Sequence, residues 1–456
     1  MRIPGHLSPS VYPILGFLSL IIVGTLALEF IPLRHGGHLP LIDSLFMVTS
    51  AVCVTGLAVI DVGKDLSGAG QTALLILIQM GGLGIMTFST VLLLLLGRSI
   101  SFRSRFVVQD IFAHSPQADL FVLLRRVLLF TLSFEAAGAF LLYSRFHQQY
   151  DASTAWFHAI FHSVSAFCNA GLSLYSDNFM GYRDDVLVNL TVIGLIVFGG
   201  LGFMVMHELA RALETRTSRR HLWNRLSLHS KIVLSMTAVL LAGGTVFFLL
   251  SEWSTTLAGL PFSTKLLASF FQSVTPRTAG FNTLDYASMN NITLLGTIML
   301  MFIGASPGST GGGIKTSTLG VLLVLSRARL KGSSDHVHAF KRSISPSTVN
   351  QAYGTFAISV IIVILGAAAL LISETGSVPF HETSGQFMEL LFETTSAFGT
   401  VGLSLGITPK LNTWSKFILV VIMFTGRLGP LVIAMAIQAE ESKGKFYYAQ
   451  EPIMIG

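Results

Sequence analysis

Long apolar runs alternate with short polar connectors along almost the whole chain. A helix needs about 20 predominantly apolar residues to cross the hydrocarbon core of a bilayer. Eight runs reach about that length, and each predicts a spanning helix: Val11–Ile31, Thr72–Leu96, Leu120–Tyr143, Val186–Leu213, Ile232–Leu250, Thr293–Leu325, Tyr353–Ile372 and Lys416–Ile437. The first run is too long for a signal peptide and lacks a small-residue cleavage site. The pattern therefore predicts an all-α polytopic membrane protein.

Shorter apolar runs lie between the two members of each pair of spans. They are too short to cross a membrane, so each predicts a half-helix that enters and stops. These runs are Leu41–Val48, Ala155–His162, Thr264–Phe271 and Gly385–Phe392. Each is followed by a glycine-containing stretch before the next span begins, which gives the order span, half-helix, loop, span.

The glycines after the half-helices mark an internal repeat. Gly56, Gly171, Gly280 and Gly402 are separated by 115, 109 and 122 residues. A fixed period of this kind is the sequence signature of a repeated structural unit. We expect four membrane-pore-membrane repeats with pseudo-fourfold symmetry, built from eight spanning helices and four re-entrant half-helices. The expected boundaries are 1–97, 98–226, 227–343 and 344–438, followed by a cytoplasmic C-terminal tail at 439–456.

The four loops agree in sequence when they are aligned on these glycines, and a serine stands six positions earlier in three of them. Non-helical backbone at membrane depth must be buried in protein or line a watery cavity. Carbonyl oxygens turned toward one axis can replace the water shell of a cation, and glycine permits the backbone angles required. The candidate ion-binding residues are Val54, Thr55, Gly56, Asn169, Ala170, Gly171, Thr278, Ala279, Gly280, Thr400, Val401 and Gly402. Ordinary extracellular turns between helical hairpins remain the alternative, and the loops alone do not name the ion.

Composition and charge agree with a membrane protein. The mean hydropathy is +0.68, with 52% hydrophobic and 11% charged residues, which excludes a water-soluble globule. The net charge of +6 comes from basic clusters after the second, fourth and sixth spans, which the positive-inside rule places in the cytoplasm together with both termini. The clusters are Arg98, Arg103, Arg105, Arg125, Arg126; Arg211, Arg216, Arg219, Arg220, Arg225, Lys231; and Arg327, Arg329, Lys331, Lys341, Arg342. This distribution disfavours a nucleic-acid partner, and two cysteines make no disulfide framework.

The sixth run contains the stretch "GASPGSTGGGIKTST", which should interrupt its helix. A proline and a run of glycines in mid-span both oppose helix continuation. We interpret the stretch as an intramembrane loop beneath the glycine loops that can block ions, and a simple kink is the alternative. The candidate gate residues are Gly304, Ala305, Ser306, Pro307, Gly308, Ser309, Thr310, Gly311, Gly312, Gly313, Lys315 and Arg427.

Arg427 and Lys315 are charged residues at costly positions, because charges within spans are expensive. Arg427 lies inside the last span, in the alignment column that Gly82 and Gly200 occupy in repeats one and two. A permanent charge there can repel a passing cation, although a structural tie between two helices is the alternative. Arg277 lies next to the third glycine loop and is expected to brace that loop from behind.

No enzyme site is expected. The stretch "GSTGGGIKT" departs from the phosphate-binding pattern because Ile314 separates Gly313 from Lys315, and the strand-then-helix context is missing. The histidines are scattered; His336 and His338 lie in a hydrophilic loop. Any dependence on ATP or NAD(H) is therefore expected to come from a partner chain.

These stretches resemble the Ktr/Trk/HKT superfamily of potassium transporters, most closely its KtrB-type membrane subunits. The motifs that carry the resemblance are "TSAVCVTGLAVIDVG" (Thr49–Gly63), "HSVSAFCNAGLSL" (His162–Leu174), "FQSVTPRTAGFNTLD" (Phe271–Asp285), "ETTSAFGTVGLSLGITP" (Glu393–Pro409) and "MFTGRLGPL" (Met423–Leu431). The resemblance implies potassium uptake through a filter of four glycines, with a gating loop at the interrupted span. It also implies a homodimer in the bacterial cytoplasmic membrane and a cytosolic, nucleotide-binding, KtrA-like RCK ring.

The resemblance also bears on ion choice. Family members with serine at the first filter position tend to transport sodium, so Gly56 indicates K⁺ as the transported ion. The resemblance also implies Na⁺ as a co-regulator. An ion-coupled secondary transporter with alternating access also uses repeats and broken helices and remains the second hypothesis.

Overall fold

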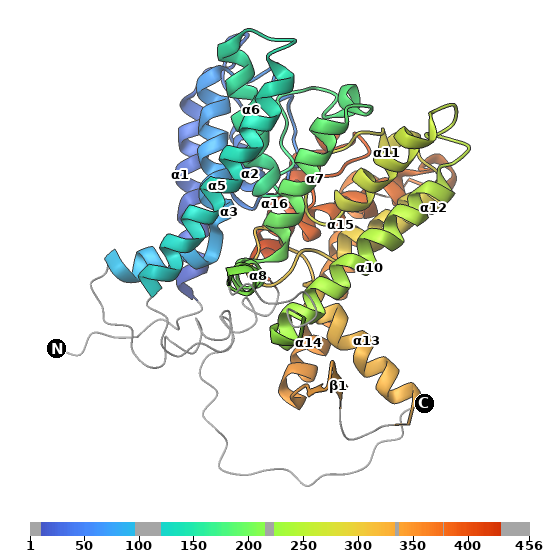
Figure 1. The fold of residues 1–456 in the computed structure, drawn as a ribbon. Coiled ribbons are helices and arrows are strands. Elements are labelled where there is room, and N and C mark those ends of the chain that lie inside the picture. Colours follow the sequence, from blue (N-terminus) through green and yellow to red (C-terminus); the bar gives the residue numbers. More distant parts are fainter. Residues whose placement is uncertain (1–10, 96–119, 215–222, 333–336, 377, 430–456) are drawn as a thin grey trace, which may run out of the picture.

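The computed structural model describes residues 11–95, 120–214, 223–332, 337–376 and 378–429, and these are mostly helical (Figure 1). The α-helices are α1 Val11–Phe30, α2 Leu41–Val52, α3 Gly68–Leu95, α5 Leu120–Phe146, α6 Ala152–Phe167, α7 Val186–Leu201, α8 Phe203–Glu214, α10 Leu228–Ser251, α11 Phe262–Val274, α12 Asn291–Phe302, α13 Thr316–Leu330, α14 Pro346–Glu374, α15 Gln386–Gly399 and α16 Thr413–Leu428. Single 3-10 turns lie at Met180–Tyr182, Tyr286–Ser288, Phe380–Glu382 and Thr408–Lys410. A short antiparallel hairpin, β1 His338–Ala339 and β2 Arg342–Ser343, joins α13 to α14.

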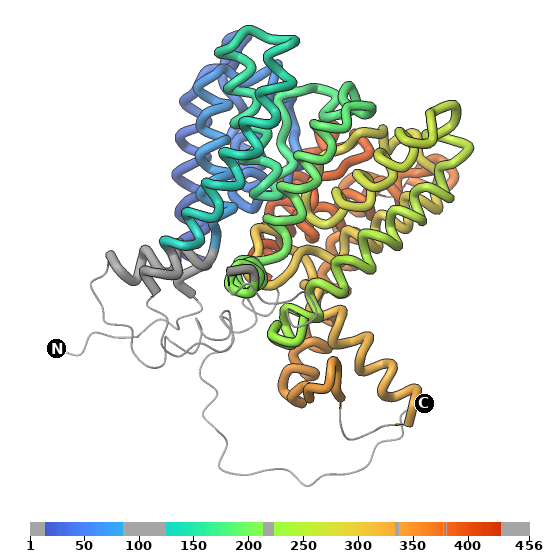
Figure 2. The backbone as a smooth tube through the Cα atoms, viewed as in Figure 1, coloured from blue at the N-terminus to red at the C-terminus, as the bar shows by residue number. Residues whose placement is uncertain are grey.

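Among the described residues, the helices pack in four groups arranged in cyclic order. Each group has a first long helix, a short helix and a second helix: α1–α3, α5–α7, α10–α12 and α14–α16. In every group the first helix packs on both of the others, and the second helix also packs on the short helix of the next group: α3 on α6, α7 on α11, α12 on α15 and α16 on α2. The last contact closes the ring, and Figure 2 shows the red end of the chain between the blue beginning and the yellow third group.

Each first helix touches its short helix at a glycine, which permits a close approach of the two backbones. A Cβ atom built on Gly24 would lie 2.8 Å from the side chain of Val48. The matching pairs in the other groups are Gly138 with Ser163, Gly244 with Ser273 and Gly366 with Thr394, at 2.5, 2.3 and 3.0 Å. The same local packing thus recurs once in each group.

The lengths of the helices confirm three of the eight expected spans. In the described part of the chain, three helices are long and apolar enough to cross a membrane: Arg125–Phe146, Leu228–Ser251 and Pro346–Glu374. The fourth predicted run is not one straight helix, since α7 and α8 meet at an angle of 101°. Gly202, with φ of +90°, stands at this bend, where only glycine adopts the required angle without strain. The sixth run is interrupted between α12 and α13, as its proline and glycines predict.

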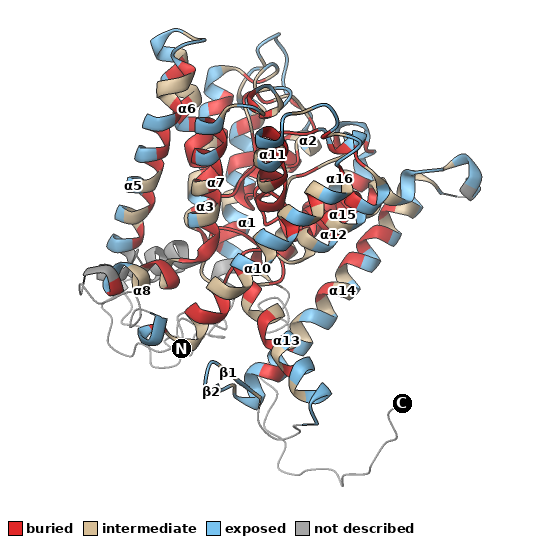
Figure 3. Cartoon of the chain, turned by 45° about the vertical axis from the view of Figure 1, so that its right-hand side comes forward, coloured by how far each residue is buried: buried red, intermediate tan, exposed pale blue. Residues whose placement is uncertain are grey.

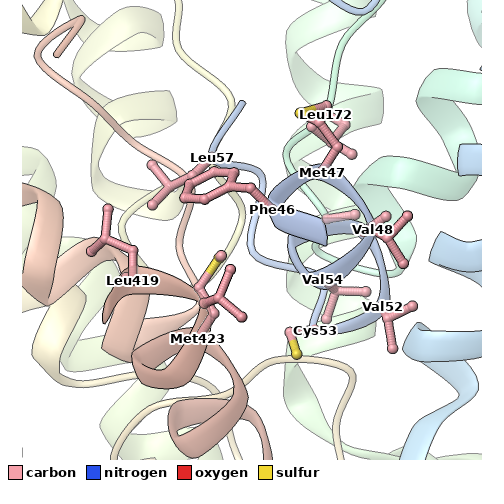
Figure 4. Close-up of a cluster of buried hydrophobic side chains, with 14 of the residues drawn as sticks. Phe46, Met47, Val48, Val52, Cys53, Val54, Leu57, Leu172, Leu419 and Met423 are labelled. Atoms are coloured by element: carbon pink, nitrogen blue, oxygen red, sulfur yellow. The ribbon is translucent and has the colours of Figure 1, made fainter. Parts of the chain in front are cut away.

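Burial is greatest where the short helices end, and the outer faces of the long helices expose apolar side chains (Figure 3). Phe46, Met47 and Val54 belong to a cluster that also holds Leu419 and Met423 of α16, which links the first group to the fourth (Figure 4). Several expectations lie outside the described residues: Arg98, Arg103, Arg105, Arg216, Arg219, Arg220, His336, the end of the last span after 429, both termini and the 439–456 tail.

Candidate ion pathway

The four short helices end in the same unusual backbone conformation. Val54, Asn169, Thr278 and Thr400 have φ of +49°, +58°, +70° and +50°. A residue with a Cβ rarely adopts this left-handed region, and it persists where the surrounding structure demands it. In each loop the residue stands two positions before the repeat glycine. Because the strain recurs at the same place four times, we treat residues 54–56, 169–171, 278–280 and 400–402 as one constellation, the glycine loops.

The repeat glycines meet in a closed ring. A Cβ atom built on Gly56 would lie 2.6 Å from the carbonyl oxygen of Ala170, and one built on Gly171 would lie 2.7 Å from that of Ala279. The series continues from Gly280 to Val401 at 2.4 Å and closes from Gly402 to Thr55 at 2.2 Å. Any side chain at these glycines would therefore overlap the backbone of the neighbouring loop. The four carbonyl oxygens in these contacts are those of Thr55, Ala170, Ala279 and Val401, one from each loop.

Hydroxyl groups at the ends of the short helices hold the glycine loops in place. Ser50 Oγ accepts a hydrogen bond from Gly56 N at 3.0 Å, and Ser396 Oγ accepts one from Gly402 N at 3.1 Å. In the second loop Ser165 Oγ donates to the Leu172 carbonyl at 2.7 Å. The third loop uses Thr275, whose hydroxyl donates to the carbonyl of Phe281. Alignment on the glycines does not identify Thr275, because Thr275 stands five positions before Gly280, whereas the serines stand six positions before their glycines.

The interrupted segment 303–315 lies directly against the ends of the glycine loops. Its two ends pair at Ile303 and Ile314, which makes it a closed loop between α12 and α13. Thr310 Oγ1 donates to the Phe167 carbonyl at 3.3 Å, and Gly312 N donates to Thr400 Oγ1 at 3.0 Å. A Cβ built on Gly311 would lie 2.0 Å from Thr278 Oγ1. The loop thus touches the ends of the second, third and fourth short helices.

The interrupted segment also forms hydrogen bonds with the bend between α7 and α8 in the second group. Ser306 N donates to the Gly200 carbonyl at 3.0 Å, and Phe203 N donates to the Gly308 carbonyl at 3.0 Å. The break at Gly202 leaves carbonyl groups of α7 without helical partners, and the loop supplies donors to them. The proline and glycines of this segment predict the interruption, but nothing in the sequence indicates this partner.

Arg427 joins the loop to two groups of helices. Its side chain on α16 is 5% exposed and donates to the carbonyl oxygens of Thr310 in the loop and Gly81 in α3. Gly81, Gly199 and Gly426 each approach the last turn of their own short helix, with built Cβ atoms 2.0, 1.9 and 2.0 Å from a carbonyl oxygen. Arg427 follows Gly426, so it occupies the place that a glycine fills in the first two groups.

The other basic residues lie in different surroundings. Lys315 Nζ donates to the Gly311 carbonyl at 2.7 Å, within the interrupted loop itself. Arg277 is 7% exposed and points away from the glycine ring, since its Nη2 donates to Thr237 Oγ1 of α10 at 3.3 Å. This geometry supports a bracing role for Arg277 behind the third loop. Within the described ranges, no three His, Cys, Asp or Glu side chains gather where they could hold a metal ion.

Comparison with known proteins places the chain in a family. Residues 16–446 match the family model TrkH, described as a cation transport protein. The chain is 40% identical to the Ktr system potassium uptake protein B of Bacillus subtilis over 95% of this chain and 94% of that protein. It is 36% identical to the potassium/sodium uptake protein NtpJ of Enterococcus hirae over 100% and 99% of the two chains.

A solved structure shows the same fold. The potassium transporter TrkH from Vibrio parahaemolyticus superimposes with a TM-score of 0.74 at 19% identity, over 95% of this chain and 85% of that one. The expected resemblance is thereby confirmed, as is the expectation of a transport protein and not an enzyme. This chain is a multi-span helical membrane protein that belongs to the TrkH family of cation transport proteins.

Proposed function

We propose that this chain is the pore-forming membrane subunit of a bacterial potassium uptake system. The observation that carries the proposal is the closed ring of Gly56, Gly171, Gly280 and Gly402, each against a carbonyl group of the next loop. Backbone carbonyls around an axis are the ligands that replace the hydration shell of K⁺ in potassium filters. The twelve residues of the glycine loops are therefore the proposed selectivity filter.

The proposal of potassium as the transported ion is supported by relatives whose names state which ion they transport. Relatives from Bacillus subtilis and Vibrio alginolyticus, 40% and 37% identical, are potassium uptake proteins, and the Enterococcus hirae relative is a potassium/sodium uptake protein. On this chain K⁺ is the proposed transported ion and Na⁺ a co-regulator.

The proposed architecture is four membrane-pore-membrane repeats related by pseudo-fourfold symmetry. The short helices α2, α6, α11 and α15 are the re-entrant half-helices, and the long helices that flank them make eight spans, with breaks at Gly84, at Gly202 and at residues 303–315. The cyclic packing of α3 on α6, α7 on α11, α12 on α15 and α16 on α2 supports this arrangement. The repeats keep the boundaries 1–97, 98–226, 227–343 and 344–438.

The proposed gate consists of the loop 304–315 and Arg427. The loop touches Phe167, Thr278 and Thr400 at the inner ends of the filter, where it would obstruct an ion that leaves the filter. Arg427 adds a positive charge beside the obstruction and ties it to Gly81. Opening then requires the loop to leave these partners.

The proposed assembly is a homodimer with one pore in each subunit, regulated by a cytosolic KtrA-like ring that binds nucleotide. The relatives of the Ktr system support such a partner by their names. The chain is proposed to lie in the cytoplasmic membrane with both termini inside, so that Arg327, Arg329 and Lys331 at the end of α13 face the cytoplasm.

Purified protein in proteoliposomes tests the function. A K⁺ gradient should drive uptake of labelled rubidium that external K⁺ inhibits and an equal concentration of Na⁺ does not, with protein-free liposomes as the control. A cytosolic regulatory ring added on the outside should change the rate in a nucleotide-dependent way. Absence of K⁺-inhibited flux with and without the ring would overturn the assignment, and uptake in fixed stoichiometry with Na⁺ or H⁺ would favour alternating access.

A further inference from the structure

We infer that one side chain in each short helix positions the outer part of the filter: Met47, His162, Gln272 and Glu393. These four brace residues follow the equivalent phenylalanines Phe46, Phe161, Phe271 and Phe392. All four are fully buried, at 0% exposure. The inference rests on the proposed function, because it treats the glycine loops as the filter.

In the second group, the partners of His162 determine which of its ring nitrogens donates a hydrogen bond and which accepts one. His162 Nδ1 lies 2.8 Å from the carbonyl oxygen of His158, which can only accept, so Nδ1 carries the proton. The backbone N–H of Leu174 donates to His162 Nε2 at 3.3 Å, so Nε2 accepts. The Ser173 hydroxyl lies 3.0 Å from the same nitrogen. The neutral ring therefore holds the backbone two and three residues beyond Gly171.

The brace residue of the third group reaches the same stretch with an amide. Gln272 Nε2 donates to the Leu284 carbonyl at 3.4 Å, and Tyr286 donates its hydroxyl to Gln272 Oε1 at 2.8 Å. These partners lie four and six residues beyond Gly280. Gln272 was not recognised by alignment on the glycines, because the shorter third loop shifts it by one position.

The brace residue of the fourth group is a carboxyl group in the same place. Glu393 Oε1 accepts a hydrogen bond from the Thr408 hydroxyl, and Thr408 lies six residues beyond Gly402. The second oxygen, Oε2, is buried without a hydrogen-bonding partner among the described residues. A neutral carboxyl group pays a smaller penalty for this unpaired oxygen than an ionised carboxylate would.

The brace residue of the first group is apolar. Met47 belongs to the large buried cluster that also includes Val59 and Val62, which stand three and six residues beyond Gly56. Leu172, which follows Gly171, belongs to the same cluster (Figure 4). In three groups the brace residue thus makes hydrogen bonds to the stretch beyond the glycine, and in the first group it is an apolar side chain in a buried cluster that includes residues of that stretch.

The recurrence of these hydrogen bonds at the same position in three groups indicates a positioning role that ordinary core packing does not require. The glycines touch one another, so a small shift of the stretch beyond a glycine moves the carbonyl groups of the ring. Selectivity between K⁺ and Na⁺ depends on the arrangement of those carbonyls. The brace residues touch no ion; they act through the backbone that follows the filter.

The test measures rubidium uptake and its inhibition by Na⁺ in proteoliposomes. His162→Met, Gln272→Met and Glu393→Met should each weaken the preference for K⁺ over Na⁺ by about tenfold, while Glu393→Gln and His162→Gln, which keep an acceptor, should stay within about twofold of the parent. The matched controls are Ser163→Ala and Ser273→Ala. These neighbours are equally buried but donate to the carbonyls of Glu135 and Leu241 on the first helices, not to the stretch beyond the filter.

Two partner-side variants keep the test decisive if a methionine variant does not fold. Tyr286→Phe removes only the hydroxyl that Gln272 accepts from, and Thr408→Val removes the one that Glu393 accepts from. Each should lower the K⁺ preference in the same direction. If both variants kept the parent's preference for K⁺ over Na⁺, or if the serine controls lost it equally, the proposed role of the brace residues would be wrong. A parent protein without K⁺-inhibited flux would instead overturn the proposed function.

Discussion

Arg427 on α16 donates a hydrogen bond to the carbonyl oxygen of Thr310, although 117 residues separate them in the chain. A second hydrogen bond from the same guanidinium reaches the Gly81 carbonyl on α3. One buried side chain therefore holds the interrupted loop against the first and fourth groups. Its planar fork of donors serves two acceptors that a single ammonium group could not hold in the same geometry.

Replacing Arg427 with alanine should open the pathway. Each hydrogen bond from a charged donor contributes about 1.5–3 kcal/mol, so loss of two should raise resting K⁺ flux by roughly tenfold or more. The resting K⁺ flux of Arg427→Lys should lie between those of the parent and the alanine variant, because lysine keeps the charge but loses the planar set of donors. Flux in proteoliposomes measures the effect. A well-folded alanine variant with flux at or below the parent value would show that Arg427 only ties the helices together.

Deletion of Gly308 to Gly313 should also raise flux and uncouple it from the regulatory partner. The deletion removes the groups that donate to Phe167 and Thr400, while the paired ends at Ile303 and Ile314 remain. Flux should be measured with and without the cytosolic ring. If the shortened protein reaches the membrane and still conducts at the parent rate, the loop is not an obstruction.

Gly402→Ser should weaken K⁺ selectivity, and Gly56→Ser should act in the same way. A Cβ at Gly402 would lie 2.2 Å from the Thr55 carbonyl oxygen, so a carbonyl of the ring must move. Gly406→Ser is the matched control, because Gly406 has a similar φ of +86° but nothing within 4 Å of its built Cβ. Selectivity that stays at the parent value in both filter variants would contradict the filter assignment.

The ion pair between Lys416 on α16 and Asp43 on α2 should stabilise the closure of the ring. Their side chains are 13% and 17% exposed and the N–O distance is 2.6 Å. Asp43→Asn should lower the free energy of unfolding by about 2–3 kcal/mol, slightly less than for a fully buried pair. Thermal unfolding in detergent gives the value. The double variant Asp43→Asn with Lys416→Met should recover part of the loss, and a further drop would argue against a direct pair.

Glu252, just beyond the end of α10, should make stability depend on pH. Burial raises the pKa of its carboxyl group, but hydrogen bonds from Thr255, Thr293 and Asn290 outweigh burial and hold the pKa below the ordinary value of 4.5. The stabilisation is therefore present above pH 4.5 and is lost as pH falls through the lowered pKa. The unfolding temperature should drop in that range for the parent. Glu252→Gln should have a lower unfolding temperature at pH 7, and that temperature should fall less in acid. An acid response equal to that of the parent would show that Glu252 is not its cause.

Much of the organisation could be predicted from sequence, because it follows from local properties. Hydropathy alone located the eight apolar runs, since lipid requires long apolar helices whatever surrounds them. Proline and glycine located the interruption at 304–315, because these residues oppose a helix locally. The spacing of Gly56, Gly171, Gly280 and Gly402 located the loops that meet in the ring.

The remaining features depend on which parts of the chain meet in space. The bend at Gly202 could not be predicted, because glycines in an apolar helix are tolerated until a partner such as the 303–315 loop accepts the break. Alignment on the glycines also does not identify Thr275 and Gln272. The third group has one residue fewer between Thr275 and Gly280, so both residues are shifted by one position in the alignment. Sequence determined that Arg427 stands inside a span. Only the tertiary structure decided that its guanidinium meets the Thr310 and Gly81 carbonyls, because buried donors take the acceptors that packing brings within reach.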